Sequence, residues 1–385
     1  MKGAIFIWLL SSIAMAMASV NYIKSVYVLN SRDSTTFEKM VLDNEKKRLF
    51  VAAENLLIEM DEEKFQDITS VSTGPRMDAL LCPTHILNHP CDYPLVKTNS
   101  YCKALLIDRH NGVLIMCTSL YQGICIKYNL TDLTELDESL QSRQSIVANN
   151  ATASTVAFIA PSPLLDDKNH QMDALYVGVQ YTGQGWQRNR IPAFASLRLN
   201  NFKLVHDSMT LYKTEINAES NVKARFPIYY KYGFSSEGFN YMLTVQKESP
   251  DASRELYISK IFRVCQMDQW FVSYVELHLQ CWHQGTLYNL TQSAHLGKAG
   301  VNLAKALGIS ALEDVLYVTF SKGPPRSAEP NRGSAVCIYP MRYIRSKFTE
   351  NVKKCFEGIG NTGPPHFFKP NKCSNLSVSI GVCLN

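Results

Sequence analysis

The sequence predicts an all-β protein built as a radial array of small sheets, of the β-propeller kind. The stretch Phe226–Gln246 alternates apolar and polar residues with a period of two on both sides of a tight turn. Segments with the same strand–turn–strand pattern recur at intervals of about 55 to 85 residues. The chain has 385 residues, of which 46% are hydrophobic, enough for one large all-β domain or two average domains.

The stretch Phe226–Gln246 is predicted to be a hairpin, with its turn at Ser235–Gly238. The aromatic and aliphatic residues of each strand are expected to share one face: Ile228, Tyr230, Tyr232 and Phe234 in the first, and Phe239, Tyr241, Leu243 and Val245 in the second. Such residues suit a half-buried pleated surface. A single hairpin is only marginally stable in water, so this one must pack against other sheets.

Other segments follow the same pattern of an apolar strand, a loop and a second strand. They are Arg48–Met60, Gly112–Tyr128, Asp173–Tyr181 with Pro192–Arg198, and Asp314–Lys322 with Ser334–Pro340. A small sheet cannot cover both of its faces alone, whereas neighbouring blades cover each other and ring closure removes long edges. A β-sandwich fits less well, because its strands recur at roughly 8–12 residues.

One segment departs from this pattern. Gly285–Ile309 has apolar residues at helical spacing, which predicts a helical insertion of two short helices separated by Gly297 and Gly300. The insertion could cap a blade or form contacts with a partner. Residues 135–155 and 322–333 are polar and are predicted to be loops.

The chain is predicted to be exported. Residues 1–18 read as a secretory signal peptide, with Lys2, an apolar run and an Ala16-Met17-Ala18 cleavage site. No later apolar run is long enough to span a bilayer. Eleven cysteines fit an oxidising compartment. Four sequons predict glycosylation at Asn129, Asn150, Asn289 and Asn375.

No motif in the sequence predicts catalysis or a cofactor. The nucleophile elbow, the H-E-x-x-H helix and the P-loop lysine are absent from the sequence, and the carboxylates are scattered. The net charge of +5 is too mild for a nucleic-acid-binding protein. Gly358–Gly363 matches G-x-G-x-x-G, but Pro364 and Pro365 follow at once, which is wrong for a dinucleotide site.

The segment Cys82–Cys91, which contains His85 and His89, has spacings that zinc could use. In an oxidising compartment two cysteines nine residues apart more often form a local disulfide, so the disulfide is favoured over the metal. The sequence therefore favours a binding module without metal or cofactor.

Several segments together resemble the sema domain of plexins, the semaphorin receptors, from about residue 20 to 375. They are Thr73-Gly-Pro75 before Cys82, Gly112–Cys117 with Gln122–Cys125, Tyr176–Gly183, Tyr232–Gln246, Ser259–Cys265, Ser273–Leu277 before Cys281, Asp314–Leu316 with Phe320–Gly323, Ser334–Ile338, and Cys355 with Gly358–Asn361. The stretch Gly358–Asn371 leans towards class B plexins.

The resemblance implies a seven-bladed propeller over residues 19–372 and a set of disulfides. By position it pairs Cys82 with Cys91, Cys117 with Cys125, Cys281 with Cys337, Cys355 with Cys373, and Cys265 with Cys383. Cys102 is left over, either buried and free or paired between chains. Residues 373–385 form a divergent tail that ends where the first cysteine-rich module of plexins would begin, so we expect a truncated or secreted receptor fragment.

The resemblance also implies the function: a non-enzymatic, extracellular semaphorin-binding module, with a homodimer through the propeller as a further partner. The family grips semaphorin around its third and fourth blades, here roughly Tyr181–Lys213. On composition, the candidate contacts are Arg188, Arg190, Phe202, Lys203 and His206. The alternatives are a secreted sema-domain ligand and a secreted propeller glycosidase, which would need clustered acids around a funnel.

Overall fold

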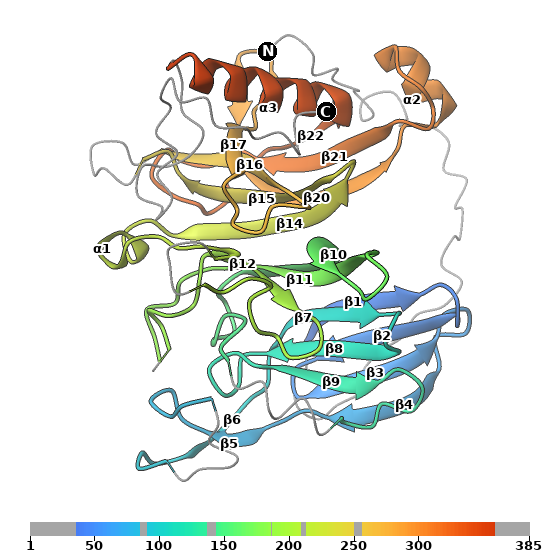
Figure 1. Cartoon of the computed structure of the whole chain (residues 1–385), viewed down its shortest axis with the longest axis vertical. Helices are drawn as coiled ribbons and strands as arrows, with labels where there is room; N and C mark the ends of the chain where they lie inside the picture. Colours follow the sequence, from blue (N-terminus) through green and yellow to red (C-terminus); the bar gives the residue numbers. More distant parts are fainter. Residues whose placement is uncertain are drawn as a thin grey trace. The chain divides into compact units, whose positions relative to one another are not determined.

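The computed structural model describes residues 36–84, 91–136, 144–185, 187–208, 213–249 and 256–358. These residues form antiparallel sheets and three helices (Figure 1). They divide into two compact units, which are described separately: unit 2 holds the described residues up to Ala153 together with Thr182–Ile191, and unit 1 holds Ser154–Tyr181 and those from Pro192 onwards. No helix within these ranges is long and apolar enough to cross a membrane.

Unit 2 contains three antiparallel sheets. Their strands, in sheet order, are β1 (Phe37–Asp43), β2 (Arg48–Ala53), β3 (Leu56–Asp61) and β4 (Asp67–Ser72); β5 (Arg76–Asp78) and β6 (Val96–Thr98); and β7 (Cys102–Asp108), β8 (Val113–Thr118) and β9 (Cys125–Asn129). Phe50, Leu57, Leu114 and Met116 are fully buried in one core cluster. The hairpins predicted at Arg48–Met60 and Gly112–Tyr128 are therefore confirmed.

Unit 1 contains four antiparallel sheets. Their strands are β10 (Thr155–Leu165), β11 (Gln171–Val179), β12 (Phe194–Arg198) and β13 (Glu215–Ile216); β14 (Ile228–Ser236), β15 (Phe239–Lys247), β16 (Tyr257–Cys265) and β17 (Val275–His278); β18 (Cys281–His283) and β19 (Thr286–Tyr288); and β20 (Leu290–Lys298), β21 (Asp314–Ser321) and β22 (Ser334–Pro340). The helices are α1 (Ser220–Lys223), α2 (Gly300–Leu307) and α3 (Met341–Phe356). Across both units, five of the described sheets have the three or four strands of a blade.

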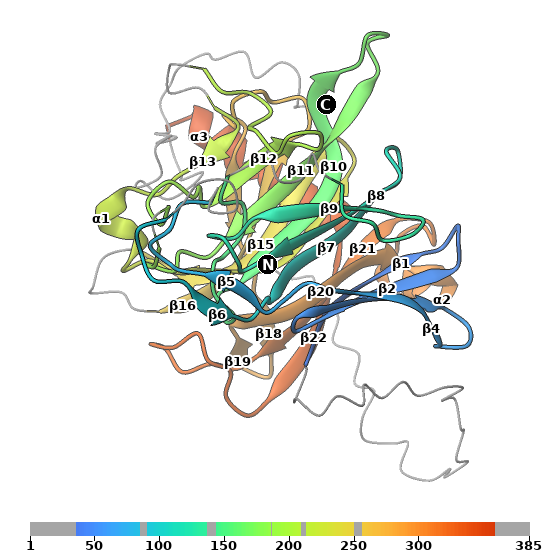
Figure 2. The ribbon, with the colours of Figure 1, turned by 90° about the horizontal axis from the view of Figure 1, so that it is seen from below.

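The long β10–β11 hairpin projects beyond its sheet. Within β11, the residues that pair with β12 are Ala174–Gly178. The outer end of the hairpin, where Leu165 pairs with Gln171, therefore has no third strand beside it. Figure 2 shows this end of β10 and β11, in green, reaching past its neighbours in unit 1. The end therefore presents both edges of a two-stranded ribbon.

The hairpin predicted at Phe226–Gln246 is confirmed as β14 and β15, but its predicted single apolar face is wrong for β14. The turn is Glu237–Gly238, where both residues have positive φ (44° and 80°), as a tight two-residue hairpin turn requires. A bulge between Tyr230 and Tyr232 shifts the register. As a result Ile228 and Tyr230 lie in one core cluster, whereas Phe234 lies in the other.

The helical insertion predicted at Gly285–Ile309 is half wrong. Its first part is strand, because Leu290–Lys298 pairs along β21, with Gly297 opposite Val315. Leu290 and Ala294 are four residues apart, a spacing that fits one helical turn and also two strand repeats. Only Gly300–Leu307 is helical. The predicted loops carry no strand where they are described, except that Thr155 begins β10 and Glu135 makes an isolated bridge.

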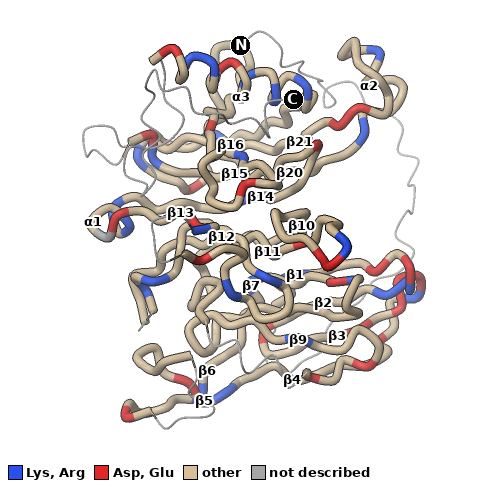
Figure 3. The backbone as a smooth tube through the Cα atoms, viewed as in Figure 1, with Lys and Arg blue, Asp and Glu red and all other residues tan. Residues whose placement is uncertain are grey.

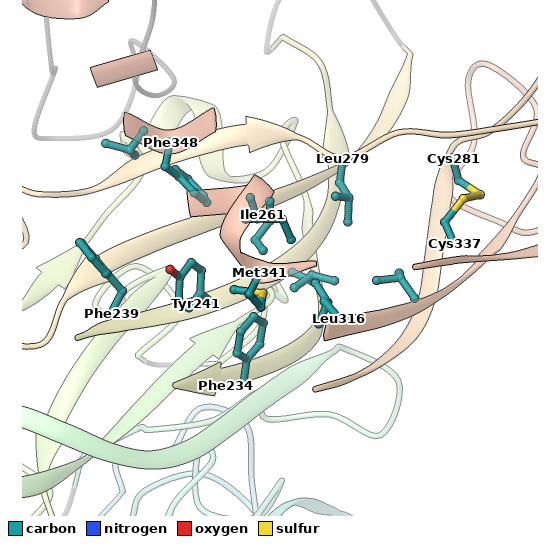
Figure 4. Packing of buried hydrophobic residues seen from close by; sticks show 14 of the residues in the cluster. Phe234, Phe239, Tyr241, Ile261, Leu279, Cys281, Leu316, Cys337, Met341 and Phe348 are labelled. Atoms are coloured by element: carbon teal, nitrogen blue, oxygen red, sulfur yellow. A yellow bond between two sulfur atoms is a disulfide. The ribbon is translucent and has the colours of Figure 1, made fainter. Parts of the chain in front are cut away.

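Helix α3 was not expected from the sequence, yet it completes the larger core of unit 1. Its buried residues Met341, Ile344, Phe348 and Val352 recur at helical spacing. The Phe348 ring centroid lies 6.0 Å from that of Tyr241 in β15. Figure 4 shows Met341 and Phe348 packed beside Tyr241 and Phe234.

Three disulfides join Cys82 to Cys91, Cys117 to Cys125, and Cys281 to Cys337, the pairs that the resemblance implied. The bond at Cys82 leaves no thiolate there for zinc, and His85 and His89 lie outside the described residues. Cys265 and Cys355 are also disulfide-bonded, whereas Cys373 and Cys383 lie outside the described residues. Cys102 is free and buried.

The glycosylation predicted at Asn289 does not fit the structure. Asn289 is 5% exposed, its Nδ2 donates to the Tyr257 carbonyl (2.9 Å), and its Oδ1 accepts from the Gly323 amide (3.0 Å). The sequon residue Thr291 is fully buried. A glycan on Nδ2 would break this packing. Asn129 and Asn150 are half-buried, and Asn375 and the signal peptide at 1–18 lie outside the described residues.

Candidate recognition surface

The five residues proposed as partner contacts fall in two places. Arg188 and Arg190 are exposed in Thr182–Ile191, which belongs to unit 2. Phe202, Lys203 and His206 lie in unit 1, in the connection between β12 and β13. We therefore treat them as two separate surfaces.

Phe202 is a correction to the sequence prediction. Its side chain is fully buried, and its backbone is left-handed with φ of 56°. Its amide donates to the Arg198 carbonyl (2.8 Å), and the Lys203 carbonyl accepts from the Arg198 amide (2.8 Å). Phe202 is thus the core anchor of a tight turn, and a docking partner cannot touch it.

Lys203 and His206 are placed on the surface by this turn. The Lys203 amide donates to Asn201 Oδ1 (3.0 Å), and the lysine side chain is exposed. The His206 amide donates to Thr214 Oγ1 (3.1 Å). The His206 ring lies edge-on to Trp270, with 6.3 Å between centroids.

Trp270 belongs to a loop between β16 and β17 that the sequence analysis missed. Within six residues this loop exposes three large apolar side chains: Met267, Trp270 and Val272, at 43%, 41% and 43%. Such a concentration is unusual on a solvated surface and typical of an interface. Tryptophan is also enriched among the residues that dominate binding energy.

Hydrogen bonds to the Asp268 carboxylate fix the conformation of this loop. Its carboxylate is 9% exposed and accepts three hydrogen bonds: from the Trp270 amide (2.9 Å), the Ser273 amide (2.6 Å) and Ser273 Oγ (2.6 Å). Ser273 Oγ in turn accepts from the Cys265 amide (2.9 Å) at the end of β16. The loop is therefore preorganised, which lowers the entropic cost of binding through Trp270.

The β10–β11 hairpin extends this surface. Gln171 Nε2 lies 3.1 Å from Met267 Sδ, and Leu165, which pairs with Gln171, is 49% exposed. We call the set Leu165, Gln171, His206, Met267 and Trp270 the Trp270 surface. Its members come from segments about 40 to 100 residues apart, so only the folded sheets of unit 1 bring them together.

The sheet β14–β17 and its adjoining loop bury one ion pair and two titratable groups that stay uncharged near pH 7. Lys260 and Glu276 form a buried ion pair, and Tyr274 donates to Glu276 Oε2 (3.0 Å). Burial raises the pKa of Tyr274 well above its usual value, which keeps the hydroxyl protonated. Burial, and then the charge of Lys260, lowers the pKa of His278, so this imidazole is neutral near pH 7.

Basic and acidic residues alternate along the chain in both units, and Figure 3 shows them interspersed rather than gathered in one stripe. The described residues contain no group of three or more His, Cys, Asp or Glu that could hold a metal ion.

These features define an all-β fold of the sema-type β-propeller class. Residues 291–381 match the family model described as "Sema domain". The fold is similar to the solved full extracellular region of plexin A4, with a TM-score of 0.74 and 29% identity over 86% of this chain and 37% of that one. Semaphorin 1a of Drosophila, at 14% identity and a TM-score of 0.51, shares the fold alone.

Among the sequence relatives are A-type plexins. Human plexin-A4 is 32% identical over 352 residues, which cover 88% of this chain and 18% of that protein. Mouse plexin-A2 is 33% identical over 343 residues, covering 85% and 18%. The chain is thus a homologue of A-type plexins over most of its length and spans about a fifth of theirs. The lean towards class B is not supported, because these relatives are of the A type.

Proposed function

We propose that this chain is a non-enzymatic, extracellular recognition module that binds a semaphorin. The plexin resemblance supports this partner, and the Trp270 surface supplies a preorganised contact on the chain itself. The single observation that carries a recognition role is Trp270, a large apolar ring left 41% exposed on a loop that the buried Asp268 carboxylate holds in place.

The test is binding of the purified chain to a panel of immobilised semaphorins. Trp270→Ala should weaken binding at least about tenfold, because truncation of a central tryptophan typically costs 2 kcal/mol or more. Trp282→Ala is the matched control, since Trp282 lies in the same unit and is 49% exposed. Equal affinities for the two variants would overturn the proposed surface, and failure to bind any semaphorin would overturn the proposed partner.

Arg188 and Arg190 are proposed as a second, electrostatic contact. Both side chains are exposed in unit 2. Reversing both charges to glutamate should slow association and make it less salt-dependent, because exposed charges act mainly on the encounter rate. Arg225→Glu combined with Lys305→Glu, two exposed positions in unit 1, is the charge-matched control. Unchanged association kinetics would remove these two arginines from the interface.

Export through a signal peptide at residues 1–18 is part of this proposal. Disulfides persist in oxidising compartments, and three of them join described cysteines. Amino-terminal sequencing of the secreted protein should begin at Ser19 or within a few residues of it; a product that retains Met1 would contradict the prediction.

A homodimer through the propeller stays a prediction. Sedimentation velocity would reveal it as a species of twice the mass of the secreted chain. Monomer at every concentration up to about 100 μM, where even weak contacts associate, would speak against it.

A further inference from the structure

The loop that carries Arg188 and Arg190 is held by a buried pair of amide side chains. Asn149 is 5% exposed and Gln122 is 2% exposed, and both belong to unit 2, as the loop does. We call this pair the Gln122–Asn149 clamp. Buried amides of this kind are costly unless their donors and acceptors are used, so their partners show what the pair does.

Asn149 binds the loop through both ends of its amide. Its Oδ1 accepts from Thr182 Oγ1 (2.8 Å), and its Nδ2 donates to the Gln184 carbonyl (3.0 Å). The same Nδ2 lies 3.4 Å from Gln122 Oε1. The Asn149 side chain thus binds both a side chain and a main-chain group of the loop, the Thr182 hydroxyl and the Gln184 carbonyl.

Gln122 is itself held by residues outside the loop. Its Nε2 donates to the Leu80 carbonyl (2.8 Å). Tyr121 and Gln122 both have positive φ (51° and 69°), and the Tyr121 amide donates to Asp78 Oδ2 (2.8 Å), which holds this unusual turn. The clamp therefore rests on rigid neighbours.

Gly185 lets the loop approach the clamp closely. A Cβ at this position would lie 2.1 Å from Gln122 Oε1 and 2.6 Å from Asn149 Nδ2, and its φ of 86° already favours glycine. The Gly185 carbonyl accepts from Arg188 Nη1 (3.0 Å). The orientation of the Arg188 guanidinium is thus set by the residue that sits on the clamp.

We propose that the Gln122–Asn149 clamp is a positioning device that pre-orders the described loop residues, 182–185 and 187–190, so that Arg188 and Arg190 are presented to an acidic surface of the partner. Neither amide touches the partner. Each acts by removing the ordering cost that a free loop would meet on binding. The identity of the partner rests on the proposed function, whereas the ordering of the loop does not.

Limited trypsin digestion of the full chain tests the ordering, because trypsin cleaves after arginine. Cleavage after Arg188 and Arg190, followed by mass spectrometry, should be at least about tenfold faster in Asn149→Ala, since digestion of a locally opened segment tracks its open population. Thr182→Val, which removes one hydroxyl of the loop itself, should give a smaller rise. Gln184→Ala is the control and should leave the cleavage rate unchanged. It removes an exposed side chain but keeps the main-chain carbonyl that accepts the hydrogen bond from Asn149.

Unchanged cleavage at Arg188 and Arg190 in both Asn149→Ala and Thr182→Val would overturn the clamp. Thr182→Val keeps this readout open if Asn149→Ala fails to fold.

The docking role needs a second readout on the semaphorin panel. Asn149→Ala should weaken binding several-fold in the native background and have no effect when Arg188 and Arg190 are both alanine, because the clamp acts only through them. Faster cleavage without loss of affinity would overturn the docking role and leave the clamp. If the unmodified chain binds no semaphorin, the proposed function fails and the docking role with it, while the trypsin rates still decide the ordering.

Discussion

Asp43, the last residue of β1, shows how a buried charge is kept ionised in unit 2. Its side chain is 1% exposed, and Arg109 Nη1 lies 2.6 Å from its Oδ1. Burial opposes ionisation, but the Arg109 guanidinium and the amides of Glu45 and Lys46 outweigh it, so the pKa of Asp43 is lower than usual. An aspartate whose pKa is lower in the folded chain stabilises the fold above the unfolded pKa of about 3.9.

Asp43→Asn should therefore lower the free energy of unfolding at pH 7 by about 1 to 3 kcal/mol, the cost of breaking a buried, charged hydrogen bond. The native chain should lose this contribution as the pH falls through the lowered pKa of Asp43, so the difference between the two proteins should shrink towards pH 2. Denaturant titrations across this range measure it. Asp167→Asn, at an exposed position, should change little; a difference that stays constant with pH would contradict the assignment.

Cys102 is a buried thiol at the start of β7, 3% exposed, with its Sγ 3.4 Å from the Ala104 carbonyl. Burial, and then the charge of Glu38, raises the pKa of Cys102 to about 12. The thiolate is the reactive form, so this cysteine should be inert in the folded chain.

We expect iodoacetamide at pH 8 to leave Cys102 unmodified in the native protein and to alkylate it in denaturant. Mass spectrometry of the Cys102 peptide measures both states. Rapid native labelling, or a Cys102-linked dimer on a non-reducing gel, would contradict the buried position.

Helix α3 anchors the core of unit 1 through Phe348. This ring is fully buried, and the guanidinium carbon of Arg263 lies 4.7 Å from its centroid and 3.9 Å from that of Phe239. The 4%-exposed Arg263 is therefore held between two aromatic faces. Loss of Phe348 would open a cavity and also uncover one side of this cation.

Phe348→Ala should lower the free energy of unfolding by about 3 to 5 kcal/mol, the usual cost of a large cavity. Tyr343→Ala on the same helix is the control: Tyr343 is 52% exposed, so a change of no more than about 0.5 kcal/mol is expected. Chemical denaturation of both variants decides it. Similar losses at the two positions would mean that α3 is not packed as described.

The described part of the chain forms two units, and each unit has hydrophobic core clusters of its own. Asp43 lies in unit 2 and Phe348 in unit 1, and the contacts described above give them no common neighbour. Effects of substitutions without shared partners usually add within about 0.5 kcal/mol. Asp43→Asn combined with Phe348→Ala should therefore destabilise the chain by the sum of the single losses, measured at one temperature and pH. A clear shortfall or excess would show coupling between the two positions.

The alternation of apolar and polar residues predicted many of the strands. It did not predict strand β20 or helix α3. Leu290–Lys298 was misread as helix because a spacing of four residues fits both periods. Helix α3 was missed because its five basic residues outnumber its four buried ones: Arg342, Arg345, Lys347, Lys353 and Lys354. The local pattern is ambiguous in such segments, and the neighbouring strand or core decides between the alternatives.

The candidate site was only partly predictable. Arg188, Arg190 and Lys203 are exposed as expected, but Phe202 is buried, since an aromatic in a turn can serve the core as well as a partner. Trp270 was missed because it is followed by Phe271, and the sequence does not show which of the two aromatic rings is exposed and which is buried. The clamp residues Gln122 and Asn149 carry no motif, and the partners that they bind outside the clamp are 33 or more residues away along the chain.

The hairpin Phe226–Gln246 shows where local information ends. Alternation and the Glu237-Gly238 turn are properties of neighbouring residues, so the sequence alone determines that two strands form and pair there. The bulge at Tyr230–Tyr232 sends Ile228 and Tyr230 to one core cluster and Phe234 to the other. Only the tertiary structure decided this, because a one-residue shift in register reverses which side of the sheet a side chain faces, and the packing of both sheet faces selects the register.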